Sequence, residues 1–341
     1  MTAGQLAESL RWARKLSKTG AELGDNGLEI FGHRAASACH YWLGDFAAAR
    51  RSGDQVHRLY DPERHRALAA FTNTDPFTGE GIYRVQFLWM MGYPDQALAA
   101  SRAMEASARR RGHPFDLAFA LTLGAQLFDY LCDFDSLLQR AEEAEHISHE
   151  RGIPLLGEIM VDISRGVALL RAGRWTEALP QLDQGIERLM GTGHRIWIWY
   201  LSSLRAEALA LVGDIEGAWI LIEECATRIE ASEERSHYAE VLRLRGWILS
   251  LRGEPDQAAM TLRKALAVAR DQQAKSWELR ASTTLARLLA GCGNRDEALA
   301  LLTPIHDWFT EGRDTNDLKD AGRLLLELRN APCARRKPYP V

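Results

Sequence analysis

The sequence predicts an all-α protein: a right-handed α-solenoid of about seven helix hairpins, followed by a capping helix near its C-terminal end. Two observations predict this fold. One short motif recurs along the chain with a period of about 40 residues, and most copies follow small and apolar side chains at helical spacing. The length agrees, because 341 residues exceed most single hydrophobic cores and require two domains or a fold that grows by repetition.

The repeated motif starts with glycine, continues with four mostly polar residues and ends with alanine. A degenerate copy, CDFDSL, begins at Cys132. The six full copies begin at Gly44, Gly92, Gly173, Gly213, Gly253 and Gly293. The steps from 44 to 92, 132, 173, 213, 253 and 293 are 48, 40, 41, 40, 40 and 40 residues. Seven copies at such regular steps indicate seven structural units.

Each unit is predicted to be a helix hairpin. The residue seven places before the turn is small except for Val85, and the residue four places before it is apolar except for His40. Small and large side chains at this spacing let two helices pack closely. The glycine then ends the first helix in the left-handed conformation, and the alanine opens the second helix where a larger side chain would separate the pair. Stacked units share one core, with contacts mostly between neighbours.

In chain order, residues 3–20 have the pattern of a second helix without its first, so the chain begins within a unit. Hairpins with turns at 44, 92, 132, 173, 213, 253 and 293 follow. The long first step reflects an insert at 59–79, which predicts a long connection. Leucines at helical spacing predict a capping helix over 314–330, after Asp314 or Thr315 as N-cap. Residues 1–330 thus form one repeat domain, and 331–341 are expected to be a disordered tail.

The stretch HRIWIWYL, residues 194–201, alternates like a β-strand, but its place in the repeat predicts the entry of a helix. Trp197 lies 16 residues before Gly213, as Trp277 lies 16 residues before Gly293. We therefore expect Trp197 to pack against the preceding hairpin. Tyr200, one helical turn later, is the better candidate for contacting a ligand.

Composition excludes several kinds of partner and site. The 46 acidic and 42 basic residues give a net charge of −4, which provides no general attraction for nucleic acid or anionic lipid. The five cysteines are far apart and form no CxxC pair, so neither a disulfide framework nor a zinc site is predicted, and a cytoplasmic location is favoured. No signal peptide or apolar run of about 18 residues occurs, so we expect no membrane contact.

The glycine-to-alanine spacing, with a small residue seven places earlier, resembles the tetratricopeptide hairpin, whose usual period is about 34 residues. The segments QQAKSWELRA (272–281) and FTEGRDTNDLK (309–319), with LYDPERHRALAAF and GYPDQALAAS, resemble the C-terminal repeats of large bacterial signalling proteins. In that family a class III nucleotide cyclase or a winged-helix output domain precedes an AAA/STAND-type ATPase. The resemblance spans residues 3 to 329, but no GxxxxGK[ST] phosphate loop is present. It therefore implies only a sensor or interaction role for the repeats.

First helices line the concave surface of arrays of this type, so counting back from each turn predicts the side chains that face inward. These are Arg34, Tyr41, Trp42, Trp89, Gln126, Tyr130, Tyr200, Glu207, Arg243, Trp247 and Arg287. Aromatic and charged groups together suit a groove for a peptide or small ligand, and they equally fit a partly exposed helix surface. His146 and His149 are interpreted as a solvated helix face. No cofactor, metal site or catalytic activity is expected, because no reaction-class constellation occurs.

Arginines also recur in register, at Arg84, Arg165, Arg205 and Arg245. Stacking would align them in a ladder able to capture an acidic peptide or a carboxylate. Pairing with nearby acids such as Asp162, Glu207 and Glu240 is the favoured alternative, because unpaired stacked arginines would repel one another. The run Arg109–Arg111 is interpreted as a complement to the dipole of the helix that it ends.

Two functional hypotheses follow. The leading one is a non-catalytic interaction or regulatory module of a bacterial signalling protein, which binds a protein or peptide in its concave groove. The alternative is a small-molecule inducer sensor of a signalling ATPase or transcription regulator, because repeats of similar length in such proteins bind inducers. Both leave open the partner, the oligomeric state, the role of the insert, and whether the chain is a fragment without cyclase and ATPase domains.

Overall fold

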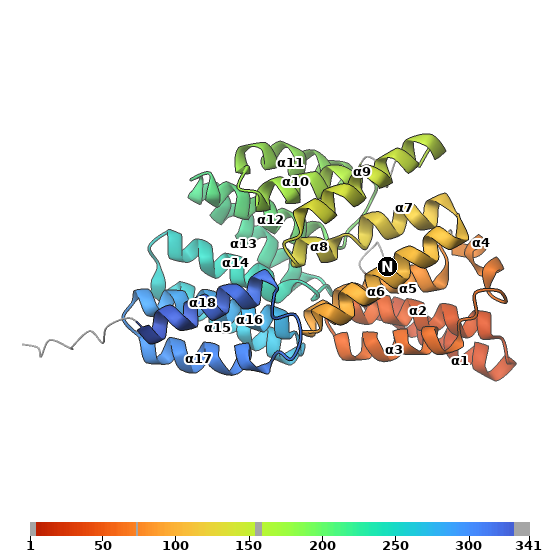
Figure 1. Cartoon of the computed structure of the whole chain (residues 1–341), viewed down its shortest axis with the longest axis horizontal. Coiled ribbons are helices and arrows are strands. Elements are labelled where there is room, and N and C mark those ends of the chain that lie inside the picture. The colour runs from red at the N-terminus through yellow and green to blue at the C-terminus, as the bar shows by residue number, and fades with distance from the viewer. Residues whose placement is uncertain (1–4, 73, 154–158, 331–341) are drawn as a thin grey trace, which may run out of the picture.

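The computed structural model describes residues 5–72, 74–153 and 159–330, and helices supply all the regular secondary structure of these ranges (Figure 1). The first part of the chain forms α1 (Leu6–Leu23), α2 (Asn26–Trp42), α3 (Phe46–Leu59), the 3-10 turn η1 (Arg66–Leu68), α4 (Ala69–Thr72), α5 (Pro76–Met90) and α6 (Pro94–Arg111). The middle forms α7 (Pro114–Leu123), α8 (Gln126–Tyr130), α9 (Phe134–Arg151), α10 (Met160–Arg171), α11 (Trp175–Gly191), α12 (Ile198–Leu211) and α13 (Ile215–Ala231). The last part forms α14 (Tyr238–Leu251), α15 (Pro255–Asp271), α16 (Lys275–Gly291), α17 (Arg295–Trp308) and α18 (Asn316–Asn330).

Each motif turn joins the two helices of a hairpin. Its six glycines have φ between +77° and +96°, and Cys132 takes the same place with φ of +56°. The backbone N–H after each turn residue donates to the carbonyl oxygen four residues before the turn, for example from Asn294 to Leu289 at 2.8 Å. Because this bond closes a helix end only when the turn residue is left-handed, glycine is favoured there.

Small residues set the distance between the two helices of a unit. A Cβ atom added to Gly166 would lie 2.9 Å from Cγ of Leu182, and one added to Gly246 would lie 2.7 Å from Cγ of Leu262. The alanines that end the six full motifs are fully buried, at 0 % exposure: Ala49, Ala97, Ala178, Ala218, Ala258 and Ala298. Larger side chains at either place would force the helices apart.

The solenoid winds so tightly that its two ends meet, with α1–α6 beside α14–α18 in Figure 1. The backbone N–H of Arg235 donates to the carbonyl oxygen of Trp42 at 2.7 Å, and Oγ of Ser276 donates to the carbonyl oxygen of Trp89 at 2.5 Å. Oε1 of Glu311 accepts the backbone N–H of Asp95 at 3.0 Å. We call this contact the seam; residues 6–7, 42–44, 89–96 and 130–132 meet residues 232–237, 272–280 and 309–317 there.

The seam adds contacts that the repeat does not predict. Packing between neighbouring helices dominates, as expected, but seam hydrogen bonds also join residues 107 to 227 positions apart. The repeat period specifies how one hairpin stacks on the next, and the small rotation at each step accumulates along the array. Contact between distant units is therefore a consequence of superhelical pitch, which the motif does not display.

The insert at 59–79 is more structured than the predicted connection. It contains η1 and α4, and its last residues form the first turn of α5. Asp75 fixes its end: Oδ2 accepts hydrogen from the Tyr60 hydroxyl at 2.7 Å and lies 2.8 Å from Nη1 of Arg111, while its N–H donates to Oδ1 of Asp116 at 2.7 Å. Arg111, interpreted above through the helix dipole alone, thus also ties α6 to the insert.

Both ends of the array agree broadly with the predicted elements. Helix α1 packs along α2, where a Cβ atom on Gly32 would lie 2.3 Å from the backbone nitrogen of Ser17. Helix α18 begins at Asn316 and packs against α16 and α17. The tail predicted for 331–341 lies outside the described residues.

The stretch HRIWIWYL is a helix entry in the structure. Helix α12 begins at Ile198, and Trp197 is its N-cap residue with φ of +71°. The Trp197 side chain lines a small cavity with Leu137 of α9 and Met160 of α10, so it packs against the preceding hairpins as expected. Trp277 lies in the first turn of α16.

Replacing two turn glycines by alanine should distinguish the cost of a left-handed alanine from the cost of a steric clash across the seam. Gly253→Ala should lower the free energy of unfolding by about 1 kcal/mol, because φ is +79° and an added Cβ meets nothing within 4 Å. Gly92→Ala should lose about 1–3 kcal/mol more, since its Cβ would lie 2.6 Å from Trp308. Urea unfolding of both variants measures the difference; equal losses would show that the seam does not hold in solution.

Candidate functional site

The structure brings five of the predicted groove aromatics together in the interior. Tyr41, Trp42, Trp89, Tyr130 and Tyr200 are each at most 7 % exposed. They were expected to face a ligand across an open concave surface. Because the solenoid closes at the seam, these side chains pack on one another instead, as in the Trp89–Tyr130 stack with ring centroids 4.4 Å apart.

His237, which the sequence analysis did not single out, lies at the centre of this aromatic cluster. Its ring stacks on Tyr200 with centroids 3.9 Å apart, and its Nε2 lies 2.7 Å from the Tyr130 hydroxyl. Nδ1 lies 2.9 Å from Oγ of Ser236. Burial lowers the pKa of His237 from 6.5 to about 3, so the ring is neutral at physiological pH. The only sequence signal for it is its position between two units.

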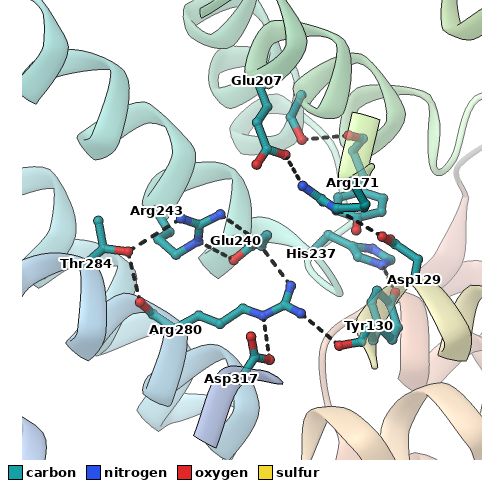
Figure 2. Close-up of polar contacts among 12 residues, drawn as sticks. Asp129, Tyr130, Arg171, Glu207, His237, Glu240, Arg243, Arg280, Thr284 and Asp317 are labelled. Atoms are coloured by element: carbon teal, nitrogen blue, oxygen red, sulfur yellow. Dashed lines mark hydrogen bonds and ion pairs between the residues drawn. The ribbon is translucent and has the colours of Figure 1, made fainter. Parts of the chain in front are cut away.

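A cavity of about 190 Å³ opens beside the cluster. We call it the charged cavity; it is lined by Cys132, Arg171, Glu240, Arg243, Arg280, Thr283, Thr284, Arg287, Asp317 and Asp320. Figure 2 shows the Arg280 side chain between Glu240, Asp317 and Tyr130. Nε of Arg280 donates to Oδ2 of Asp317 at 2.8 Å, and Nη2 donates to the carbonyl oxygen of Tyr130 at 3.0 Å. Arg280 thereby links α16, α18 and the seam.

Arg243 and Arg171 continue the ionic network. Nε and Nη2 of Arg243 each donate to a Glu240 oxygen at 2.8 Å. Arg171 donates to Oδ1 of Asp129 at 3.2 Å and to Oε2 of Glu207 at 2.7 Å. Three guanidinium groups are therefore held in place by buried or half-buried carboxylates (Figure 2).

The electrostatics keep most of this network charged. Burial would raise the pKa of Glu240, but Arg243, Arg280 and Arg171 together lower it to about 2. Burial alone would lower the pKa of Arg280. The attraction of Asp317 and Glu240 is stronger than this effect, so the pKa of Arg280 is raised. For Asp317 burial prevails and the pKa is raised. The cavity presents fixed positive and negative groups at neutral pH.

A second space of about 390 Å³ adjoins the charged cavity and shares Arg243, Thr284 and Arg287 with it. We call it the outer hollow; it is lined by Glu207, Arg243, Trp247, Ser250, Leu262, Thr284, Arg287 and Leu288. Four predicted groove residues line the two spaces: Glu207, Arg243, Trp247 and Arg287. These four residues lie on α12, α14 and α16, in the C-terminal half of the chain.

Gln126 and Arg34 are held by internal hydrogen bonds. Nε2 of Gln126 donates to Oδ2 of Asp129 at 2.8 Å. Nη2 of Arg34 donates to Oγ1 of Thr74 at 3.0 Å, so this arginine contacts the insert. Their role as ligand contacts stays a prediction.

Every arginine of the predicted ladder is paired with an acid on the preceding second helix. Arg84 lies 2.8 Å from Asp54, and Arg165 lies 2.6 Å from Glu145. The other two pairs are Arg205 with Asp183 and Arg245 with Glu223. The favoured pairing is thus present with different acids, because Asp162, Glu207 and Glu240 pair with Arg188, Arg171 and Arg243.

Other features singled out in the sequence lie on the surface. His146 and His149 are exposed on α9, and His146 lies 3.4 Å from Glu150. Within the described ranges, no three His, Cys, Asp or Glu side chains are grouped as a metal ion would require. None of the helices described there combines the length and apolar character of a membrane span.

Glu234→Gln is expected to raise the free energy of unfolding at pH 8 by about 3 kcal/mol. Burial raises the pKa of Glu234 from 4.5 to about 7. The folded chain keeps this proton while the unfolded chain releases it, so the stability present below pH 4.5 is lost as pH rises to 7. Glutamine removes the charge and retains an acceptor for the N–H of Trp197. Urea unfolding at pH 8 measures the gain, and an equal gain in the exposed neighbour variant Glu233→Gln would contradict it.

Comparison with known proteins identifies the repeats. A tetratricopeptide repeat model matches residues 159–184, 239–264 and 279–302, within the hairpins α10–α11, α14–α15 and α16–α17. No curated protein sequence gives a significant match.

Solved structures share the fold over nearly the whole chain. A Rap protein complexed with competence and sporulation factor has a TM-score of 0.59 at 11 % identity, over 96 % of this chain and 98 % of that one. NprR in complex with its cognate peptide NprX has 0.57 at 14 %, over 88 % and 84 %. The apo quorum sensor NprR from B. thuringiensis has 0.52 at 15 %, over 89 % and 82 %. The protein is thus a right-handed solenoid of tetratricopeptide-like repeats.

Proposed function

We propose that the protein is a non-catalytic regulatory module that binds a protein or peptide segment in the groove formed by the charged cavity and the outer hollow. One observation carries the proposal: two adjoining spaces combine fixed guanidinium groups with an aromatic and aliphatic wall. Rigid apolar contact area with a few orienting polar groups is the arrangement that peptide recognition uses.

Two further observations support the proposal. Structures of the same fold include one solved with competence and sporulation factor and one solved with the peptide NprX. The segments 272–281 and 309–319, which resemble bacterial signalling proteins, contribute Arg280 and Asp317 to the groove. We infer that the module serves a bacterial signalling system in the cytoplasm as its regulatory arm.

Thermal unfolding of the full chain against peptide pools and against a metabolite library tests this function. A ligand at 100 times its dissociation constant adds about 3 kcal/mol to the free energy of unfolding, which shifts the midpoint measurably. We expect stabilisation by peptides and its loss in Trp247→Ala. Stabilisation by a metabolite alone would instead establish the inducer-sensor alternative.

A further inference from the structure

We propose that the groove binds the C-terminal residue of a peptide. The α-carboxylate lies beside Arg287 and Thr284, which line both spaces, and the last side chain lies in the outer hollow against Trp247 and Leu288. This inference rests on the proposed function that the groove binds a protein or peptide, and it specifies which part of the ligand is recognised.

Arg287 is the guanidinium group that a ligand can recruit most readily. Arg280, Arg243 and Arg171 are at most 17 % exposed and bonded to buried or half-buried carboxylates. The Arg287 side chain is 50 % exposed and pairs with Asp320 at 2.6 Å. Exposed ion pairs contribute little to stability, whereas opening a buried pair leaves an uncompensated charge. An incoming carboxylate therefore exchanges with Asp320 at Arg287.

Asp320 keeps partners after this exchange. Its Oδ1 also lies 3.3 Å from Nη2 of Arg323, so releasing Arg287 does not leave the carboxylate without a cation. The last backbone amide of a peptide adds an N–H donor beside the carboxylate. If the Asp320 carboxylate accepts this N–H, it exchanges one hydrogen bond for another, and the free-energy cost of displacing it from Arg287 is small.

The charge of the cavity favours a monoanion over a phosphate group. Four arginines and three carboxylates line it, the carboxylates being Glu240, Asp317 and Asp320. One ligand carboxylate makes the negative groups of the cavity equal in number to the four guanidinium groups. A phosphate dianion would bring a second negative charge against three carboxylates, and repulsion between like charges is strong where water is partly excluded.

The outer hollow determines the kind of side chain. Trp247, Leu262 and Leu288 give it an apolar wall, and its volume of about 390 Å³ exceeds that of the charged cavity. Burial of apolar surface against such a wall favours a large apolar last residue. An apolar C-terminal residue thus fits both spaces: its carboxylate lies beside Arg287, and its side chain lies in the outer hollow.

Matched peptide pools test the proposal. Pentapeptides with four randomised positions and a C-terminal leucine are prepared as free acids and as amides, and binding to the full chain is measured by equilibrium dialysis and mass spectrometry. We expect peptides from the acid pool to bind and their amides to bind at least ten-fold more weakly. Equal binding of acid and amide overturns the C-terminal inference and leaves the proposed function standing, whereas no binding from either pool overturns both.

Two variants identify the contacts. Arg287→Ala should weaken the acids about ten-fold and leave the amides unchanged, while Arg263→Ala, an exposed arginine outside both spaces, should change neither. Circular dichroism verifies that each variant is folded. Displacement of the peptides by millimolar inorganic phosphate, or binding of free leucine as tight as that of the peptides, would overturn the assignment in favour of a simple anion site or an amino-acid site.

Discussion

Arg280→Ala is expected to lower the free energy of unfolding by about 3–5 kcal/mol, as measured by urea denaturation at pH 7. The guanidinium group is 14 % exposed and bonds the Asp317 carboxylate and the carbonyl oxygen of Tyr130. It also lies 3.5 Å from Glu240. Alanine would leave Asp317 without its cation in a half-buried site and would remove a hydrogen bond across the seam, so both local and long-range contacts would weaken.

A matched control separates this effect from the loss of any arginine. Arg263 forms an ion pair with Glu297 in which both side chains are about half exposed, at 52 % and 53 %. Arg263→Ala should therefore cost less than about 1 kcal/mol. Comparable losses in the two variants would contradict the central position of Arg280 in the network. A loss in Arg280→Ala that Arg280→Lys fully restores would show that charge alone, without the forked geometry, suffices.

The hairpins could be predicted from the sequence because each requirement is local. The left-handed turn at Gly253, the buried alanine at Ala258 and the small residue at Gly246 all lie within one unit and recur in most of the others. The motif that contains them recurs at steps of about 40 residues. Each copy of the motif is therefore independent evidence for the same geometry, and seven copies specify the fold class.

The site could be predicted only in part, because the seam is not periodic. His237, Ser276 and Glu311 make contacts with residues more than 100 positions away, and no repeated pattern marks them. Tyr130 and Tyr200 were predicted to face a groove, but they are buried, because exposure depends on how far the superhelix winds. Where the seam covers the first helices the aromatics form a core, and where it ends Arg243 and Trp247 line the groove.

The segments that carry the family resemblance coincide with this non-periodic part. Residues 272–281 hold Ser276, Trp277 and Arg280, and residues 309–319 hold Glu311 and Asp317. All five contact the seam, the charged cavity or both. These contacts belong to the seam and the charged cavity and not to the repeated motif. The two segments that carry the resemblance therefore contribute side chains to the seam and to the groove.

The effect of His237 titration on the free energy of unfolding should become measurable when the Glu234 carboxylate is removed. Between pH 3 and 6.5 the unfolded chain protonates this histidine and the folded chain does not, because burial lowers its pKa to about 3. Stability is therefore fully present above pH 6.5 and is lost on acidification, by about 1.4 kcal/mol per pH unit and about 5 kcal/mol in all. Glu234 acts in the opposite direction between pH 4.5 and 7, since its pKa is raised to about 7. The two slopes cancel from about pH 4.5 to 6.5 in the unaltered chain.

Each single variant should then expose the slope of the other group. Glu234→Gln should lose about 2 kcal/mol between pH 6.5 and 5, whereas His237→Phe should gain a similar amount over the same interval. His237→Phe also leaves the Tyr130 hydroxyl without its partner, so its absolute stability falls and the slope is the informative quantity. Urea unfolding at pH 5.0, 5.8 and 6.5 measures both, with the exposed His146→Gln as control. Parallel slopes in the two variants would contradict a neutral His237 at the seam. Opposite slopes would show that two groups three residues apart balance each other where the ends of the solenoid meet.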